Sequence, residues 1–163
     1  LQDLSRVGRG ELIVSLEKFQ SDIRSKDDTL KKIRYDLAKY HVKQIMESAL
    51  NFKDVKVLTG VVNNLDKGSL RNLVDEVKCQ INKGVVVLTS VVDGKISLVA
   101  SITDNLTPNL HAGKMVKEIA SMIDGNGGGR PTMAEAGGKD CSKISQAMEA
   151  VGIYVEKTIE KSN

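Results

Sequence analysis

Two apolar runs rich in β-branched residues, 85–92 and 95–102, flank the dipeptide Asp93-Gly94. Asp-Gly is the preferred pair for a two-residue hairpin, because both of its residues tolerate a positive φ angle. Each run also has the length of a strand rather than of a helix. The pattern therefore predicts two neighbouring antiparallel strands joined by a tight turn.

The segments around this hairpin alternate between strand and helix patterns. Residues 55–62 are a third apolar run, and a helix is predicted from Ser69, its N-cap, to a closing Gly84. The apolar face of that helix carries Leu70, Leu73, Val74, Val77 and Ile81. The alternation predicts strands and helices that share one core.

Three further elements are predicted toward the end of the chain: a helix over 109–123, a short strand over 132–136 and a last helix capped by Asp140. The inward face of the last helix carries Ile144, Ala147, Met148, Val151 and Val155. We therefore predict an α/β (α+β) fold, with a compact mixed-sheet domain and flanking helices over 53–163.

Residues 1–52 are predicted to form a helical arm. Apolar residues recur there in steps of three and four, the spacing of a coiled-coil seam, with interruptions at Lys26 and Gln44. The seam residues are Leu16, Phe19, Ile23, Leu30, Ile33, Leu37 and Tyr40. No second amphipathic helix of matching length is present, so we favour dimerisation through this seam over pairing within the chain. The chain also starts at Leu1 inside this pattern, so we expect it to be part of a longer protein.

Composition limits the partners of the chain. The formal charge is only +3, so any phosphate contact must come from a local patch. Aromatic residues are 3% of the chain, which argues against a stacking platform for single strands. Cys79 and Cys141 match no zinc or disulfide pattern, and no signal segment or membrane span is evident, so we expect a cytoplasmic protein.

The stretch NGGGRPTMAEAGG, residues 126–138, is the most unusual part of the sequence. Its spacing matches neither GxGxxG nor GxxxxGK[ST]. Glycines expose main-chain amides, and we expect a turn whose amides, with Arg130, can hold a phosphate. A structural turn, in which glycines serve only their dihedral angles, is the alternative.

Lys114, Lys117 and Lys139 flank the glycines and are predicted to join Arg130 in a basic patch. No histidine or cysteine cluster suggests a metal site, and no constellation of titratable groups suggests a catalytic centre. We therefore expect neither catalytic nor metal-binding residues, nor a cofactor, in this chain.

The run HAGKMVKEIASMIDGNGGGRPTMAEAGG, residues 111–138, resembles the carboxy-terminal domain of alanyl-tRNA synthetases. That domain carries a helix of this type followed by GGGGRP, a short strand and a final GG. Asn126 replaces the first glycine here, and the motif covers about 35 residues, while the order of the other predicted elements also fits. The domain is similar to the accessory domain of the DHH phosphoesterase superfamily, whose catalytic Asp-His-His motif is absent from this chain.

The resemblance implies a non-catalytic module that binds tRNA(Ala) and dimerises through its helical part. It would support attachment of alanine to tRNA and editing in centres upstream, where the parent protein uses ATP, Mg and, in the editing region, Zn. The implied nucleic-acid-binding residues are Lys114, Lys117, Gly127, Gly128, Gly129, Arg130, Pro131, Gly137, Gly138 and Lys139. Two alternatives stay open: a nucleic-acid-binding accessory domain of a DHH-type phosphoesterase, and a purely structural oligomerisation module.

Overall fold

The structure, a computed structural model, describes residues 3–47 and 49–161, with side chains from residue 8 onward. Its contacts divide the chain into two compact units, Leu1–Asp36 and Leu37–Asn163. The sequence predicted this boundary later, after residue 52. We describe each unit by itself.

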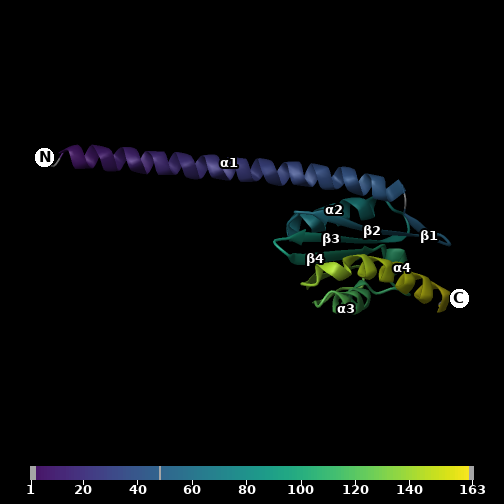
Figure 1. Cartoon of the computed structure of the whole chain (residues 1–163). Helices are drawn as coiled ribbons and strands as arrows, with labels where there is room; N and C mark the ends of the chain where they lie inside the picture. The colour runs from purple at the N-terminus through teal and green to yellow at the C-terminus, as the bar shows by residue number, and fades with distance from the viewer. Residues whose placement is uncertain (1–2, 48, 162–163) are drawn as a thin grey trace. The chain divides into compact units, whose positions relative to one another are not determined.

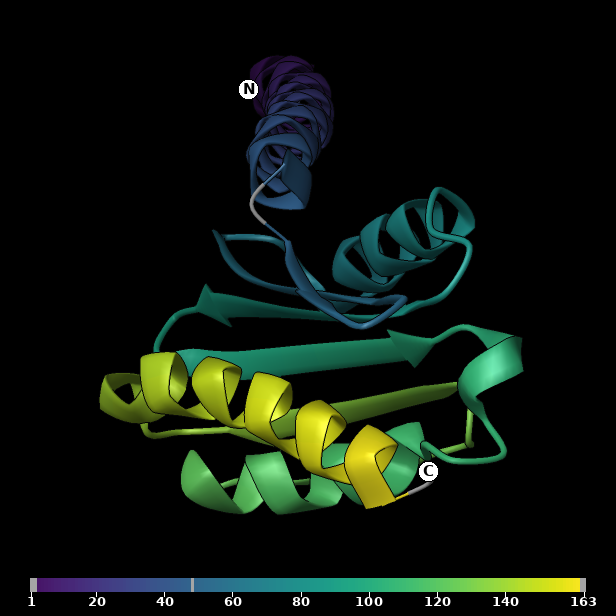
Figure 2. The ribbon, with the colours of Figure 1, turned by 90° about the vertical axis from the view of Figure 1, so that its right-hand side faces the viewer.

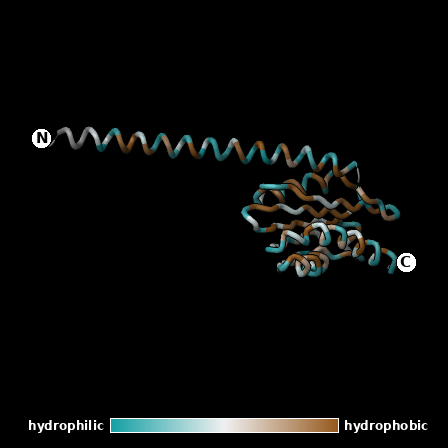
Figure 3. Tube along the Cα trace, viewed as in Figure 1, coloured by the Kyte–Doolittle hydropathy of each residue, from teal (hydrophilic) through white to brown (hydrophobic). Residues whose placement is uncertain are grey.

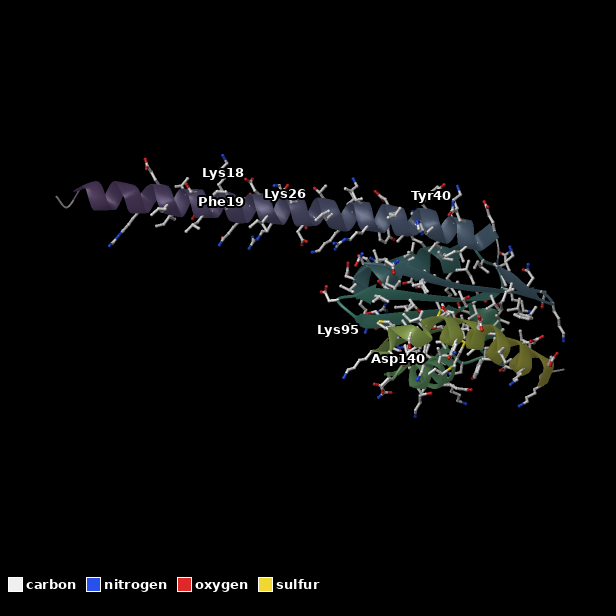
Figure 4. All side chains as sticks on the ribbon, viewed as in Figure 1. Lys18, Phe19, Lys26, Tyr40, Lys95 and Asp140 are labelled. Atoms are coloured by element: carbon white, nitrogen blue, oxygen red, sulfur yellow. The ribbon has the colours of Figure 1, made fainter. Side chains whose placement is uncertain are left out.

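The first unit consists of most of helix α1, which runs from Asp3 to Glu47 (Figure 1). Hydrophobic residues recur along it among hydrophilic ones (Figure 3). The side chains of the predicted seam are 49 to 67% exposed, and Phe19 projects freely from the helix in Figure 4. The long N-terminal helix is therefore confirmed, whereas pairing through its seam stays a prediction.

The second unit contains a six-stranded mixed sheet in the order β1-β2-β3-β4-β6-β5. Its strands are β1 (Leu50–Phe52), β2 (Val55–Asn63), β3 (Gly84–Val92), β4 (Lys95–Ile102), β5 (Asn126–Gly129) and β6 (Met133–Gly138). β2 and β3 are parallel, and the other neighbouring pairs are antiparallel. β5 thus forms one free edge of the sheet.

Helices cover both faces of this sheet. They are α2 (Lys67–Cys79), α3 (Ala112–Met122) and α4 (Ile144–Lys161). Figure 2 shows α2 on one face and α3 with α4 on the other. A short 3-10 turn, Asp104–Leu106, follows β4, and another, Cys141–Lys143, leads into α4. The predicted α/β class is confirmed.

Strand alternation divides the apolar residues between the two faces. Val85 and Val87 of β3 join the cluster under α3 and α4, while Val86 and Leu88 are buried outside that cluster. The five residues predicted to face inward on the last helix are all buried in α4: Ile144, Ala147, Met148, Val151 and Val155. Buried β-branched side chains thus explain why the central strands read as continuous apolar runs.

The predicted hairpin between β3 and β4 is confirmed. Asp93 and Gly94 have φ angles of 50° and 72°, as a two-residue turn of this hand requires. The register pairs Val92 with Lys95 and Val85 with Ile102. The turn therefore places the apolar residues of both strands on matching faces.

The predicted ends of the second helix are wrong. The cap of α2 is Asp66, whose side chain accepts a hydrogen bond from the Ser69 amide at 3.1 Å, so the helix begins before Ser69. It ends at Cys79, and Gly84 opens β3, where a Cβ would lie 2.5 Å from the Lys56 carbonyl oxygen. Gly84 is thus required by close sheet packing and not by a helix end.

The last turns of α1 belong to the second unit. Ala38 and Val42 are buried there, and the Ile45 side chain lies against Gly60 of β2. Lys39 Nζ forms an ion pair with Glu76 of α2 at 2.6 Å. The end of α1 is therefore part of the domain core.

Candidate nucleic-acid interface

A depression of about 510 Å³ lies on the α2 face of the sheet, beside its β5 edge. Its lining comes from α2, from the glycine strand β5 and from β6 with the loop before it. The lining residues are Arg71, Lys78, Gly128, Gly129, Arg130, Thr132, Met133, Ala134 and Glu135. Its size is within the range of small-molecule sites, and it is open to solvent.

The glycine run forms the edge strand β5, so the prediction of a turn is wrong. Glycine is a weak strand former, and tertiary contacts overrule that preference here. A Cβ on Gly127 or Gly129 would collide with β6, and one on Gly113 of α3 would collide with the Gly129 carbonyl oxygen. Positions 127 and 129 therefore accept only glycine in this packing against β6 and α3.

Gly128 differs from its neighbours, because a Cβ on it would meet nothing within 4 Å. It is paired with Glu135, whose side chain reaches α2, and paired residues of an antiparallel ladder share a face. Gly128 therefore presents bare backbone to the depression.

Sheet pairing uses part of the backbone of this run. The Arg130 amide donates a hydrogen bond to the Met133 carbonyl oxygen of β6 at 2.8 Å. Hydrogen bonding along an antiparallel ladder repeats every two residues, so the Gly128 amide also points to β6. The amides of Gly127 and Gly129 point to the free edge. Gly127 donates there to Oδ1 of Asn126 at 2.8 Å. The Gly129 carbonyl oxygen, which points to the same edge, packs on Gly113 of α3, so the start of α3 borders the Gly129 amide.

Arg130 extends the depression beyond the end of β5. Among residues 8–47 and 49–161, no carboxylate forms an ion pair with its guanidinium group. A guanidinium group can bind a phosphate through two parallel hydrogen bonds. Arg130 therefore has the position and chemistry of an anion contact.

The opposite wall of the depression is basic as well, through Arg71 and Lys78, with Lys67 of the same helix close by, and sequence reasoning missed it. Lys67 Nζ lies 2.6 Å and Arg71 lies 3.5 Å from the carboxylate of Glu135, while Lys78 lies 3.8 Å from Asp104. The spacing of the three cations on α2 was visible in the sequence. Their proximity to the glycine run depends on β6 and β5 lying next to β4, which no local pattern encodes.

The structure does not bring all predicted site residues together. Gly128, Gly129 and Arg130 line the depression, whereas Lys114 and Lys117 are exposed on α3, across the sheet from α2. The role predicted for these two lysines remains untested.

The remaining predicted residues have structural contacts. Gly127 is packed on β6, the Pro131 carbonyl oxygen accepts from the Ala112 amide, and Gly138 lies against Ile123. Gly137 pairs with β4 and β5 within the sheet. These contacts position the strand without excluding a ligand contact.

Lys139 lies in a second depression, of about 490 Å³, with Ser121, Asp124, Asp140 and Lys143. Asp140 accepts hydrogen bonds from Ser142 and forms an ion pair with Lys143 at 3.2 Å (Figure 4 labels Asp140). The hydrogen bond from the Ser142 side chain is the main cause, and with the contact to Lys143 it lowers the pKa of Asp140 below its usual value. Two carboxylates thus offset the two lysines in this second depression.

His111 caps α3, and its Nδ1 accepts from the Lys114 amide at 3.3 Å. Among the residues that the structure describes, no group of three potential metal ligands comes together. No described helix is both long and apolar enough to cross a membrane.

Several proteins similar to this chain carry the same name, alanine–tRNA ligase. An alanine–tRNA ligase of Carboxydothermus hydrogenoformans is 36% identical over 146 residues, which cover 90% of this chain and 17% of that protein. One of Solibacter usitatus is 35% identical over 157 residues, covering 96% and 18%. The chain therefore spans less than a fifth of the length of these relatives.

A solved structure and a family model agree with this result. The C-Ala domain of Aquifex aeolicus alanyl-tRNA synthetase is 27% identical, with a TM-score of 0.63, over 66% of this chain and 97% of that one. The model of the DHHA1 domain matches residues 54–157, most of the second unit. The chain belongs to the DHHA1 domain family.

Proposed function

We propose that this chain is the carboxy-terminal tRNA-binding module of an alanyl-tRNA synthetase. The observation that carries the proposal is the structural match to the C-Ala domain, nearly all of which is covered. Relatives named alanine–tRNA ligase, 32 to 39% identical, support the same parent protein. Activation and transfer of alanine, editing, and the ATP, Mg and Zn they use would belong to upstream regions, and the parent would be cytoplasmic.

The glycine strand supplies a surface suited to an RNA backbone. Bare main chain at Gly128 lets a sugar-phosphate strand approach closely, and Arg130 at its end adds a positive charge. Folded RNA is recognised largely by shape and backbone, so a module of net charge +3 with few aromatic residues is adequate. The depression is therefore the proposed contact with tRNA(Ala).

Two substitutions test this contact in the 163-residue chain. We expect Arg130→Ala to weaken binding of tRNA(Ala) transcript about fivefold or more, and to reduce the slope of log K against log salt concentration by about one. Gly128→Val is expected to weaken binding while preserving the fold, because its side chain would enter open space in the depression. Arg24→Ala removes an equal charge from the arm and is the control.

The outcomes separate this proposal from its alternative. A wild-type chain with no salt-dependent affinity for tRNA(Ala) would be a structural module only. If Arg130→Ala and Gly128→Val bind like the wild type, the chain binds RNA through another surface.

We further propose that the exposed seam of α1 pairs with a second copy of the chain. Its seven apolar residues lie at coiled-coil spacing. None of them is more than about half buried within a single chain. Pairing would remove these side chains from water, which stabilises the dimer.

A further inference from the structure

We propose that α2 carries a second row of phosphate contacts, Lys67, Arg71 and Lys78, and that Glu135 occupies two of them until RNA phosphate displaces it. The inference rests on the proposed function, and it deepens it. It adds Arg71 and Lys78, which line the depression opposite the glycine strand, Lys67 beside them, and a carboxylate that regulates the availability of Lys67 and Arg71.

The three cations lie on one side of α2, Lys67 and Arg71 one turn apart and Lys78 two turns further on, with Val74 and Asp75 between them. At about 100° per residue, positions 67, 71 and 78 fall within an arc of about 40°. The buried face of the helix, which carries Leu70 and Val77 among others, borders this arc. The row extends over about 16 Å of helix, long enough to follow several phosphates of one strand.

Glu135 lies beside the N-terminal part of this row, where it contacts Lys67 and Arg71. Its side chain is 25% exposed, and its two oxygens are used separately, Oε2 by Lys67 at 2.6 Å and Oε1 by Arg71 at 3.5 Å. A carboxylate held between two cations occupies the position that a phosphate oxygen would take. It thereby reduces the positive potential of the depression in the absence of RNA.

The ion pairs are suited to exchange. Lys67 and Arg71 are each 56% exposed, so water screens their attraction to Glu135. A phosphate strand offers the same cations several acceptors and gains from released counterions. Lys78, whose side chain is 25% exposed, lies 3.8 Å from the largely exposed Asp104. Glu135 should therefore weaken RNA binding without preventing it.

The test is titration of the chain with tRNA(Ala) transcript at several salt concentrations. Glu135→Gln keeps the size of the side chain and removes its charge. We expect about fivefold tighter binding at low salt and a slope of log K against log salt steeper by about one. Glu156→Gln, on the exposed surface of α4, changes the net charge equally and should leave both quantities close to wild type.

A double-mutant cycle identifies the cations involved. Arg71→Ala should reduce affinity more in the Glu135→Gln background than in the wild type, because Arg71 is then fully available to phosphate. Thermal melting of each variant checks that the fold is retained. Additive effects of the two substitutions would overturn the role of Arg71 as a masked contact.

Failure of this inference is distinguishable from failure of the proposed function. Equal binding by wild type, Glu135→Gln and Glu156→Gln overturns the masking role and leaves tRNA binding intact. Binding that appears only in Glu135→Gln supports masking and contradicts tRNA binding by the unmodified chain. Absence of binding in all variants overturns both.

Discussion

The backbone of Gly113, in the first turn of α3, lies so close to the carbonyl oxygen of Gly129 that no Cβ fits between them. The contact packs the start of α3 on the edge strand β5. It explains why one side of the proposed RNA-binding strand is rigidly supported while the other is open.

Gly113→Ala should destabilise the domain, although alanine is the better helix former by about 1 kcal/mol. We expect a loss of about 1 to 3 kcal/mol, because α3 must move away from β5. Thermal or urea unfolding measures it. The matched variant is Gly128→Ala, whose Cβ would meet nothing within 4 Å and which should melt close to wild type. A Gly113→Ala protein as stable as wild type would show that the packing is looser than described.

Val42→Ala should lower the free energy of unfolding by about 2 kcal/mol, because Val42 is 1% exposed in the core of the second unit. Val14→Ala, at a position of the same helix that is 64% exposed, should change it by less than about 0.5 kcal/mol. Chemical unfolding compares the two. Equal effects would mean that the end of α1 is not part of the folded domain.

The Asp66 cap should make the stability of the fold depend on pH. The Ser69 side chain, as the main cause, holds the pKa of Asp66 below its usual 3.8 in the folded chain. The charged cap therefore stabilises the fold at pH values above its unfolded pKa of about 3.9, and this stabilisation is lost as pH falls through the lowered folded value.

Asp66→Ala should accordingly cost about 1 kcal/mol at pH 7 and progressively less below about pH 4. Asp66→Asn retains a capping oxygen without a titratable charge, so it should cost less at pH 7. Unfolding curves at pH 7 and pH 3 test both. The same difference between Asp66→Ala and wild type at both pH values would contradict this role.

Phe19→Ser combined with Ile23→Ser should shift the chain from dimer to monomer, since two adjacent positions of the seam then lose their apolar surface. Lys18→Ser with Lys32→Ser changes exposed positions of the same helix outside the seam and should leave the assembly unchanged (Figure 4 labels Lys18). Sedimentation velocity distinguishes the species. A wild-type chain that sediments as a monomer at all concentrations would rule out pairing through the seam.

Local patterns were sufficient for most elements of the fold. The Asp93-Gly94 hairpin and the long helix α1 follow from turn chemistry and apolar spacing, which depend on residues close in sequence. The predicted α2 boundaries failed because Asp66 competes with Ser69 for the cap, and both residue types are good N-caps. When two nearby residues are equally good N-caps, the path of the chain before the helix decides which of them caps it.

The glycine run shows the limit of such reasoning. Its sequence suggested a turn, because glycine has no preference for extended backbone. Contact with α3 and β6 makes it a strand, and the same contacts select glycine at 113, 127 and 129. The basic wall of α2 was missed because its cations precede the run by 48 to 59 residues in sequence.

The sequence by itself determined the helical arm, the mixed sheet with covering helices and the presence of an unusual glycine run beside Arg130, because apolar periodicity and turn chemistry act between near neighbours in the chain. Only the tertiary structure decided that the run is an edge strand. Only the tertiary structure, likewise, brings Lys67 and Arg71 into ion pairs with Glu135, which lines the depression beside that strand. The physical reason is the order of the strands: placing β6 and β5 beyond β4 brings distant residues together, and the burial of apolar surface that favours such an order is a sum over the whole domain and not over any one segment.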